Sequence, residues 1–364
     1  MTVPDRSQLA EHAQAITEAV LRACDPAVAL ERAWTQELDS ANRVVLIAAG
    51  KGSAAMASIA VERLRERVIA GAVATVPDHA DRVRAAARAS GATLTVHEAD
   101  HPLPTDRNRV AAKAIADAAG LAGEQDLVLA LISGGASAHL AMPADGVTLD
   151  DLRETTNALL RAGAEIAEVN AVRKHCEVLK GGGLARLVWP ARLRAFVLSD
   201  VLGDRLDAIG SGPTAPDKTT FEAALAVLDR YDLRRVSPSI TARLVRGARG
   251  EEQETPKAGD PIFERSRHQI IASNRVAIDA AVQACEGLGF VTHRVEQDIT
   301  GEASTVAEGL VAVVNRACAE HDDARCIVLG GETTVTVGDA GGTGGPCQEV
   351  VLRAAAVDGN PLGI

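Results

Sequence analysis

A lysine stands inside a glycine turn near the start of the chain, at Gly50-Lys51-Gly52-Ser53. The turn follows a short apolar run and precedes a segment with helical periodicity. Glycines at such a junction let backbone amides approach a pyrophosphate, and a lysine there favours phosphate or carboxylate. The segment fits the dinucleotide pattern G-x-G-x-x-A but fails the Walker A pattern, because Val45 stands where its first glycine belongs. An anion site and a tight turn that needs small residues explain this segment equally well.

Two further loops of small residues follow predicted strands. Ser133-Gly134-Gly135-Ala136-Ser137 comes directly after Leu127–Ile132, the clearest buried strand of the sequence. Small residues and hydroxyl groups at the carboxyl end of a parallel strand are suited to cradle a ligand. Gly330–Thr334 also ends an apolar run, and the eight residues from Gly338 to Gly345 include five glycines. This density indicates a loop that closes over a polyanion, although an exposed hairpin has the same composition.

Cations cluster beside a glycine run in the middle of the chain. Arg173, Lys174 and Lys180 lie next to Gly181-Gly182-Gly183, in a chain that is acidic overall. Such a cluster is more often a solvated face than a binding site. The segment that follows it favours a binding site.

That segment carries two carboxylates, Asp200 and Asp204, after the strand predicted over 194–198. Carboxylates near bound phosphates are the usual Mg²⁺ ligands, and one of the pair is also a candidate general base. Small, hydroxyl-bearing residues follow at Ser211-Gly212-Pro213-Thr214. A polar surface turn is the alternative interpretation.

The segment His97-Glu98-Ala99-Asp100-His101 has the spelling of the zinc-protease motif H-E-x-x-H. Both histidines reach one metal only when they share a face of a helix. Here a β-branched strand precedes the segment, and Pro102 disfavours the helical conformation at His101. We therefore interpret it as a junction between a strand and a turn.

The elements that must position these residues alternate between strands and helices. An opening helix is predicted over 7–33, followed by strands that include 43–49, 72–76, 93–96 and 127–132. This alternation predicts an α/β fold with a Rossmann-like, doubly wound parallel sheet. The polar stretch 246–261 separates it from a second series of strands and helices. We predict a first domain over 1–250 and a second, smaller α/β domain over 251–364.

Composition excludes several classes of protein. The 364 residues carry a net charge of −11 and only 2% aromatic residues, so both phosphate neutralisation and base stacking on nucleic acid are missing. The six cysteines form no C-x-x-C pair, which indicates reduced thiols. No signal peptide or membrane span is visible in the sequence. We expect a cytoplasmic protein that binds neither nucleic acid nor membranes.

Taken in order, these segments resemble the class II glycerate kinase family (glycerate 2-kinase, with a MOFRL-type second domain). The resemblance extends over nearly the whole chain. The combination of the SD-x-x-GD…SGPT and RKH-x-x-x-KGG segments is specific. The matching segments are AAGKGSAAMA at 48–57, HPLP at 101–104, SGGASA at 133–138, NAVRKHCEVLKGGGLA at 170–185, SDVLGDRLDAIGSGPTAPD at 199–217, ASN at 272–274, GGET at 330–333 and GGTGGPCQE at 341–349.

The resemblance implies phosphoryl transfer from ATP, with Mg²⁺, to D-glycerate, giving 2-phosphoglycerate in a cleft between two domains. Lys51 is similar to the proposed catalytic lysine of the family. Asp200 and Asp204 are the candidate catalytic and metal-binding carboxylates. Phosphoryl transfer depends mainly on positioning and on cations at phosphate oxygens, which these residue types supply. The candidate substrate- and nucleotide-binding residues are Gly50, Gly52, Ser53, Ser133, Gly134, Gly135, Ser137, Arg173, Lys174, Lys180, Ser211, Gly212, Thr214, Asn274, Gly331, Glu332 and Thr333.

Two alternatives and two departures accompany this resemblance. The family is also labelled hydroxypyruvate reductase, which makes NAD(P)H-dependent reduction the first alternative. Pro346-Cys347 stands where many members have Arg-Asn, so a contact to transition-state charge is in doubt. The closing segment of the family pattern does not follow, so we expect a C-terminally truncated second domain and, as the second alternative, an inactive ligand-binding remnant. The expected partners are glycerate and ATP, with a homodimer as a candidate assembly.

Overall fold

The computed structural model describes residues 5–296, 298–320, 325–336 and 344–357. The chain divides into two compact units. The larger unit is Pro26–Ile271, and the smaller unit combines the described parts of Met1–Asp25 and Ala272–Ile364. The polar stretch 246–261, where the sequence indicates a domain boundary or an excursion, lies inside the larger unit. Glu254 explains this placement, because its carboxylate accepts hydrogen bonds from the imidazole of His175 and the backbone N–H of Phe221.

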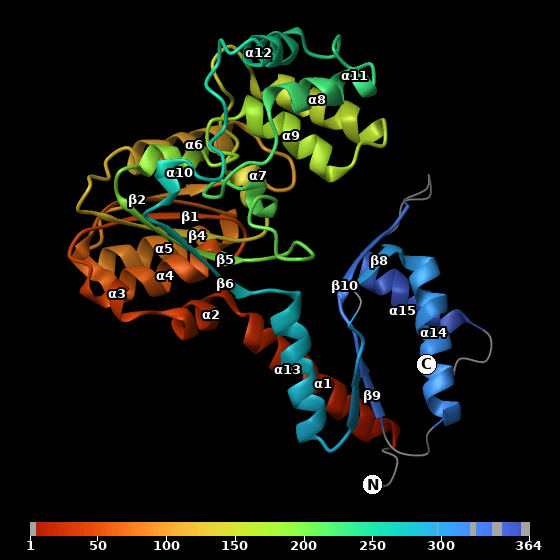
Figure 1. The fold of residues 1–364 in the computed structure, drawn as a ribbon. Coiled ribbons are helices and arrows are strands. Elements are labelled where there is room, and N and C mark those ends of the chain that lie inside the picture. Colours follow the sequence, from red (N-terminus) through yellow and green to blue (C-terminus); the bar gives the residue numbers. More distant parts are fainter. Residues whose placement is uncertain (1–4, 297, 321–324, 337–343, 358–364) are drawn as a thin grey trace. The chain divides into compact units, whose positions relative to one another are not determined.

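Six strands form the sheet of the larger unit: β1 (Val44–Ala49), β2 (Val68–Thr75), β3 (Thr95–Glu98), β4 (Leu127–Ile132), β5 (Arg192–Leu198) and β6 (Ser266–Ala272). Their order is β3-β2-β1-β4-β5-β6, and neighbouring strands from β3 to β5 are parallel (Figure 1). Strands β2 and β3 therefore follow on one side of β1, and strands β4, β5 and β6 follow on its other side. This order is that of the Rossmann fold, and the predicted doubly wound sheet is confirmed.

Helices cover both faces of this sheet (Figure 1). Helices α4 (Ser53–Leu64) and α5 (Pro77–Ser90) pack together on one face, and α6 (Asp106–Ala119) and α10 (Gly183–Val188) lie on the other. Every residue of β1 and β4 is buried. Continuous apolar runs are required there because both faces of a central parallel strand are covered.

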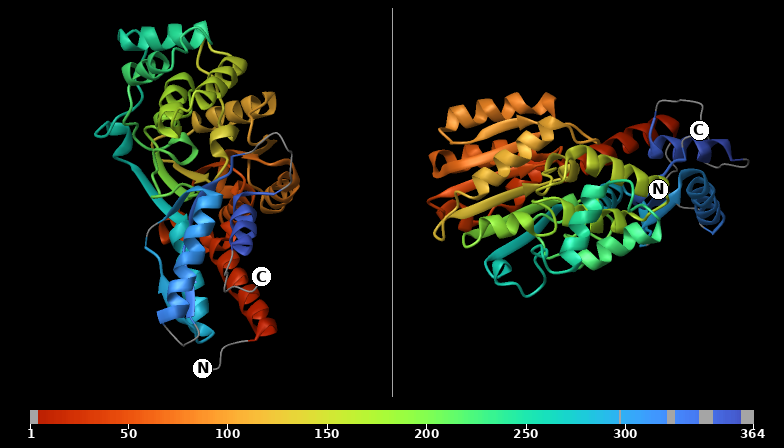
Figure 2. Two further views of the ribbon diagram at one scale, coloured as in Figure 1. Left: turned by 90° about the vertical axis from the view of Figure 1, so that its right-hand side faces the viewer. Right: turned by 90° about the horizontal axis from the view of Figure 1, so that it is seen from above.

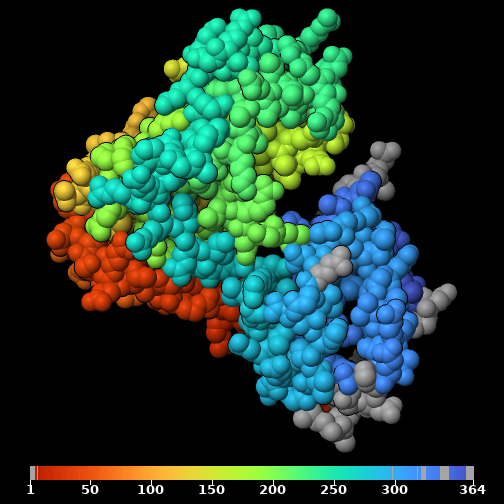
Figure 3. All heavy atoms as spheres, viewed as in Figure 1, coloured from red at the N-terminus to blue at the C-terminus, as the bar shows by residue number. Residues whose placement is uncertain are grey.

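Four helices form a separate group within the larger unit: α8 (Leu149–Arg161), α9 (Ile166–Cys176), α11 (Phe221–Arg230) and α12 (Pro238–Ala248). They pack around a core that includes Leu159, Val172, Phe221 and Ile240. Figure 1 shows the group beside the sheet, and in Figure 3 its green and cyan side chains cover this end of the unit. The C-terminal end of α9 carries the predicted cations Arg173 and Lys174.

The predicted opening helix is two helices, α1 (Arg6–Cys24) and α2 (Pro26–Ala33). Asp25 between them has an extended conformation, with ψ of 127°. Pro26 is the reason, because its ring disfavours a helical residue before it and its nitrogen donates no hydrogen bond. The break also separates the units, since α1 belongs to the smaller one. Two short helices complete the larger unit, α3 (Gln36–Ser40) and α7 (Ala136–His139).

The smaller unit also combines helices with parallel strand pairs. Helix α1 packs along α13 (Asn274–Gly287) (Figure 2), and α14 (Ala303–Glu320) packs against α15 (Pro346–Ala356). Strand β7 (Val291–Arg294) pairs with β9 (Arg325–Val328), and β8 (Ile299–Glu302) pairs with β10 (Gly331–Thr334). Among the described residues, no helix has the length and apolar character needed to cross a membrane.

Candidate active site

The loops that follow β1 and β4 are joined at the point where the strand order reverses. The backbone N–H of Lys51 donates to the carbonyl oxygen of Gly134 at 2.8 Å, and that of Ser133 donates to Ala49 at 3.0 Å. In open α/β sheets, ligands bind outside the carboxyl ends of the strands at this switch point. The two glycine loops predicted from the sequence therefore lie together and form a single candidate site.

The amides of the Gly50–Ser53 turn are all occupied by acceptors within the protein. Lys51 donates to Gly134, the N–H of Gly52 donates to the hydroxyl of Ser133 at 2.9 Å, and that of Ser53 donates to Gly50 at 3.2 Å. Gly50 has φ of +115°, and a Cβ there would lie 2.3 Å from the Ser133 hydroxyl oxygen. The glycines thus serve the close approach of two loops. The turn does not hold these amides ready for a pyrophosphate, and what it presents to solvent is the Lys51 side chain.

His139 lies beneath this turn and is fully buried. Its Nδ1 lies 3.1 Å from the backbone nitrogen of Gly50, whose N–H donates to it when Nδ1 carries no proton. The same Nδ1 lies 3.2 Å from the carbonyl oxygen of Ala74, so the tautomer decides which contact is a hydrogen bond. Burial lowers the pKa of His139 from its ordinary value of 6.5 to about 4. The imidazole is therefore neutral at physiological pH and can accept the Gly50 N–H.

Three polar side chains converge above Gly134 and Gly135. A Cβ on Gly135 would lie 3.2 Å from Cγ of Lys51 and 3.1 Å from Cδ2 of His101. A Cβ on Gly134 would lie 2.1 Å from a carboxylate oxygen of Asp200, the second residue after β5. A side chain at Gly134 would require the Asp200 carboxylate to shift, and one at Gly135, where φ is +86°, would crowd the side chains of Lys51 and His101. Lys51, His101 and Asp200 are exposed, and within the described part of the chain none of them forms an ion pair.

His101 lies beside Gly135 at this candidate site and was not among the residues predicted to bind substrate or nucleotide. Partial burial and the positive charge of Lys51 lower the pKa of His101, while the carboxylate of Asp200 opposes this shift. The signal was its place in the HPLP segment, which we had used only as part of the resemblance. The exclusion of a zinc motif is supported by geometry, since His97 lies on β3 while His101 lies beyond the strand, and neither is helical.

Lys174 and Lys180 are buried and already paired. The ammonium of Lys174 lies 3.1 Å from the carboxylate of Asp217, and that of Lys180 lies 3.0 Å from Glu177. Burial lowers the pKa of Lys180 to about 8. Lys180 also donates to the carbonyl oxygen of Ser137 at 2.7 Å. Both lysines are held by these contacts, and they line a separate cavity of about 250 Å³ rather than the surface above Gly134 and Gly135.

Arg173 supports the same loop, because its guanidinium donates to the Ser137 carbonyl at 3.1 Å and pairs with Glu177. The hydroxyl of Ser137 lies 2.8 Å from that of Ser211, which donates to Asn170. Ser211 has a positive φ of +63°, a strained conformation for this residue type. These contacts tie the loop after β4 to the segment around Ser211.

The segment around Ser211 is also tied to the glycine run. The N–H of Gly181 donates to Ser211 at 3.0 Å, and that of Gly182 donates to Gly212 at 2.7 Å. Thr214 contacts the sheet instead. Its carbonyl and hydroxyl oxygens lie within hydrogen-bond distance of the imidazole of His268 on β6. The structure therefore brings Ser211 and Gly212 to the Ser137 loop, while buried Thr214 contacts the edge of the sheet.

The candidates of the smaller unit cluster among themselves. A Cβ on Gly330 would lie 2.4 Å from the side-chain oxygen of Asn274 at the start of α13. Gly331, Glu332 and Thr333 form strand β10, where we had expected a loop after a strand. Glu332 is exposed to solvent. Most of the predicted glycine loop Gly338–Gly345 lies outside the described residues.

The carboxylate pair was also predicted to hold a metal. Gly203 and Asp204 have φ of +75° and +52°, so the chain turns sharply after Asp200. Among the residues that the structure describes, no three His, Cys, Asp or Glu side chains are arranged to share a metal. An all-protein cage is therefore absent from the described part, whereas a cation held by one or two carboxylates and by substrate phosphate requires no third ligand from the protein.

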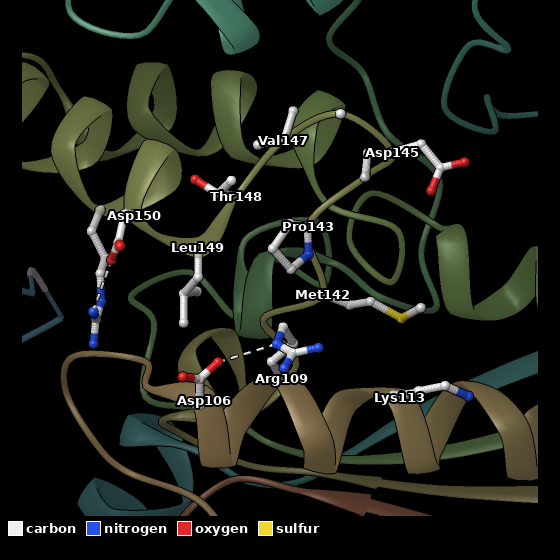
Figure 4. Close-up of a pocket in the computed structure, with 13 residues that line it drawn as sticks. Asp106, Arg109, Lys113, Met142, Pro143, Asp145, Val147, Thr148, Leu149 and Asp150 are labelled. Carbon is white, nitrogen blue, oxygen red and sulfur yellow. Dashed lines mark hydrogen bonds and ion pairs between the residues drawn. The ribbon is translucent and has the colours of Figure 1, made fainter.

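A cavity of about 510 Å³ lies between α6 and the start of α8 (Figure 4). Its arginines are paired with neighbouring carboxylates, Arg109 with Asp106 at 3.2 Å and Arg153 with Asp150 at 3.2 Å. These charges compensate one another locally. Lys113 at the same cavity is also paired, with Asp117 at 2.6 Å, so the cavity lacks the unpaired cation found above Gly134 and Gly135.

Known proteins are similar to this chain in sequence and in fold. The family described as a domain of unknown function, DUF4147, matches residues 12–245. The glycerate 2-kinase of Pyrococcus horikoshii is 36% identical over 323 residues, which are 88% of this chain and 70% of that protein. The chain belongs to the glycerate 2-kinase family. The resemblance inferred from the sequence motifs is confirmed.

Two further comparisons complete the placement in the glycerate 2-kinase family. The crystal structure of glycerate kinase from Thermotoga maritima matches with a TM-score of 0.80 and 31% identity, covering 97% of this chain and 82% of that one. A protein of Agrobacterium vitis, provisionally named hydroxypyruvate reductase, is 35% identical and covers 93% of this chain and 74% of its own length. Members of the family thus carry both names.

Proposed function

We propose that the chain is a glycerate 2-kinase, which transfers a phosphoryl group from ATP to D-glycerate and gives 2-phosphoglycerate. The observation that carries the proposal is the convergence of Lys51, His101 and Asp200 above two glycines at the switch point of the sheet. The relatives named glycerate 2-kinase support the same activity. Phosphoryl transfer requires a positioned cation and a carboxylate rather than covalent chemistry by the protein.

Each of the three side chains has a proposed part in this reaction. The ammonium of Lys51 neutralises charge that develops on the transferred phosphoryl group. Asp200 has carboxylate oxygens that are not used in an ion pair within the described chain, and this suits it to hold Mg²⁺ together with phosphate oxygens. Bound Mg²⁺ supplies further neutralisation of phosphate charge. His101, whose lowered pKa keeps it neutral, offers a hydrogen bond to glycerate.

The remaining candidates position these groups. Lys180 and Arg173 hold the Ser137 loop through its carbonyl oxygen, and Lys174 holds the carboxylate of Asp217. Ser133 and His139 fix the turn that carries Lys51. Asp204 stays a second candidate ligand for Mg²⁺. The location of the site in a cleft between domains, the cytoplasmic location and the homodimer stay predictions.

Hydride transfer is the less supported alternative. A dinucleotide turn must offer free amides to a pyrophosphate, whereas the N–H groups of Gly50, Lys51 and Gly52 are directed at acceptors inside the protein. The turn instead presents the Lys51 side chain, whose ammonium can neutralise charge on a transferred phosphoryl group.

One assay separates the three candidate functions. Purified full-length protein is given ATP, Mg²⁺ and D-glycerate, and the product is passed to enolase, which accepts 2-phosphoglycerate and not the 3-phosphate. We expect glycerate-dependent ADP release and an enolase-positive product. NADH oxidation with hydroxypyruvate and no ADP release would establish the reductase instead. Glycerate and ATP binding by calorimetry, without either reaction, would establish the inactive remnant.

A further inference from the structure

Two cysteines of the smaller unit lie in direct contact. Cys285 on α13 and Cys326 on β9 are 41 positions apart in the chain, yet their sulfur atoms are 3.0 Å apart. The distance in a disulfide bond is about 2.05 Å, so the two sulfurs need to move by about 1 Å to bond. Neither thiol belongs to the site above Gly134, and their contact does not depend on the proposed kinase activity.

The two thiols differ in their access to solvent. Cys285 is fully buried, whereas Cys326 is partly exposed. Both contribute to the wall of an apolar cavity of about 400 Å³ within the smaller unit. A small, uncharged oxidant can enter such a cavity and meet Cys326 first. Burial raises the pKa of the Cys285 thiol to about 12, which protects that sulfur from direct oxidation.

We propose that Cys285 and Cys326 are a redox site, which peroxide converts into an intramolecular disulfide between α13 and β9. In the first step the Cys326 sulfur attacks one oxygen of hydrogen peroxide, the O–O bond breaks, and one water leaves with Cys326 as a sulfenic acid. In the second step the Cys285 sulfur attacks the Cys326 sulfur. The S–O bond then breaks, and the hydroxyl leaves with the Cys285 proton as a second water.

The two steps balance. The thiols together lose two protons and two electrons, and these reduce the peroxide to two molecules of water. The disulfide closes a long loop of the chain, so it restricts the unfolded state and stabilises the smaller unit. A dithiol reductant reverses the reaction by thiol–disulfide exchange.

The test uses full-length protein with the exposed Cys347 replaced, Cys347→Ser. This change matters because trypsin, which cleaves after Arg325 and Arg353, leaves Cys326 and Cys347 on one peptide. Reduced protein is treated with equimolar hydrogen peroxide, alkylated, digested and examined by mass spectrometry. We expect peptide 276–294 linked to peptide 326–353, two hydrogens lighter than their sum, and lost after dithiothreitol.

The midpoint of thermal unfolding provides a second measurement on the same protein, in which Cys285 and Cys326 are both kept. We expect the oxidised form to melt at least ~5 °C higher than the reduced form. Matched variants Cys285→Ser and Cys326→Ser should show neither the linked peptide nor the rise. Alkylation of both thiols after peroxide treatment, or accumulation of a sulfinic acid on Cys326 while Cys285 stays a thiol, would overturn the proposal.

Discussion

The backbone N–H of Lys51 donates to the carbonyl oxygen of Gly134 at 2.8 Å, which joins the loop after β1 to the loop after β4. Both loops stand at the point where the strand order of the sheet reverses. Because the backbone of Lys51 is fixed in this way, its flexible side chain starts from a defined position beside His101 and Asp200. The proposed catalytic cation is therefore placed by the sheet rather than by a mobile loop.

Replacing Lys51 tests the proposed cation. We expect Lys51→Ala to lower turnover with ATP and glycerate by at least ~10²-fold, because a charge that acts on the transition state is lost. Circular dichroism should be unchanged, since the side chain is exposed. Lys113→Ala is the matched control, because Lys113 pairs with Asp117 at the surface and lies at the cavity of Figure 4. Equal activity of the two variants would remove Lys51 from the site.

Replacing Asp200 should change the Mg²⁺ requirement of the reaction more than replacing Asp204. Asp200 lies directly against Gly134, whereas Asp204 follows in a turn with positive φ. We expect Asp200→Asn to lower turnover by about 10²-fold or more and to raise the Mg²⁺ concentration for half-maximal rate. Asp204→Asn should change both quantities less. The reverse order in a Mg²⁺ titration would make Asp204 the principal ligand.

Gly134 tests whether the close approach of Asp200 matters. In Gly134→Ala the added Cβ would lie 2.1 Å from the Asp200 carboxylate oxygen, so that side chain must move. We expect a loss of activity of at least ~10-fold, with KM for glycerate and kcat measured separately. Gly309→Ala is the control, because a Cβ there has nothing within 4 Å and the helix favours alanine. Full activity of Gly134→Ala would show that the position of Asp200 is not critical.

Lys174 should be a structural residue rather than a substrate ligand. Its ammonium is the partner of the buried Asp217 carboxylate. We expect Lys174→Met to lower the free energy of unfolding by about 3–5 kcal/mol, because an unpaired charge stays buried. The double variant Lys174→Met/Asp217→Leu removes that charge and should recover part of the loss. Urea unfolding measures the free energy of unfolding of the single and the double variant. A stable Lys174→Met protein with a raised KM for ATP would instead indicate a nucleotide contact.

His139 should make stability depend on pH. The pKa of its imidazole is 6.5 ordinarily and about 4 in the fold. Between these values the unfolded chain binds the proton and the folded chain does not, so stability is complete above pH 6.5 and falls as pH drops toward 4. Protonation of His139 lowers the free energy of unfolding by at most about 3 kcal/mol.

Urea unfolding at pH 7 and pH 5 checks the expected pH dependence. His139→Asn keeps an acceptor near the position of Nδ1 and should show a smaller difference between the two pH values. The exposed His79→Asn is the control and should behave as the parent protein. An unchanged pH dependence in His139→Asn would assign the effect to another group.

The sequence predicted the sheet, and the loops that we propose form the site, because these signals are local. Continuous apolar runs at 44–49 and 127–132 indicate strands covered on both faces, and glycine loops directly after them indicate ligand sites. The break at Pro26 and the strand at Gly331–Thr334 were missed. In the first case helical periodicity outweighed the proline, and in the second the strand depends on pairing with Ile299–Glu302, which no local pattern shows.

The sequence by itself determined the family, the order of the elements and the residue types that a phosphotransferase needs. The tertiary structure alone decided which charges meet. Lys51, Lys174 and Lys180 are equivalent as cations in the sequence, but the fold buries Lys174 and Lys180 against Asp217 and Glu177. It leaves Lys51 exposed beside Asp200 and His101. The physical reason is that burial and pairing depend on contacts between segments far apart in the chain, as does the contact of Cys285 with Cys326.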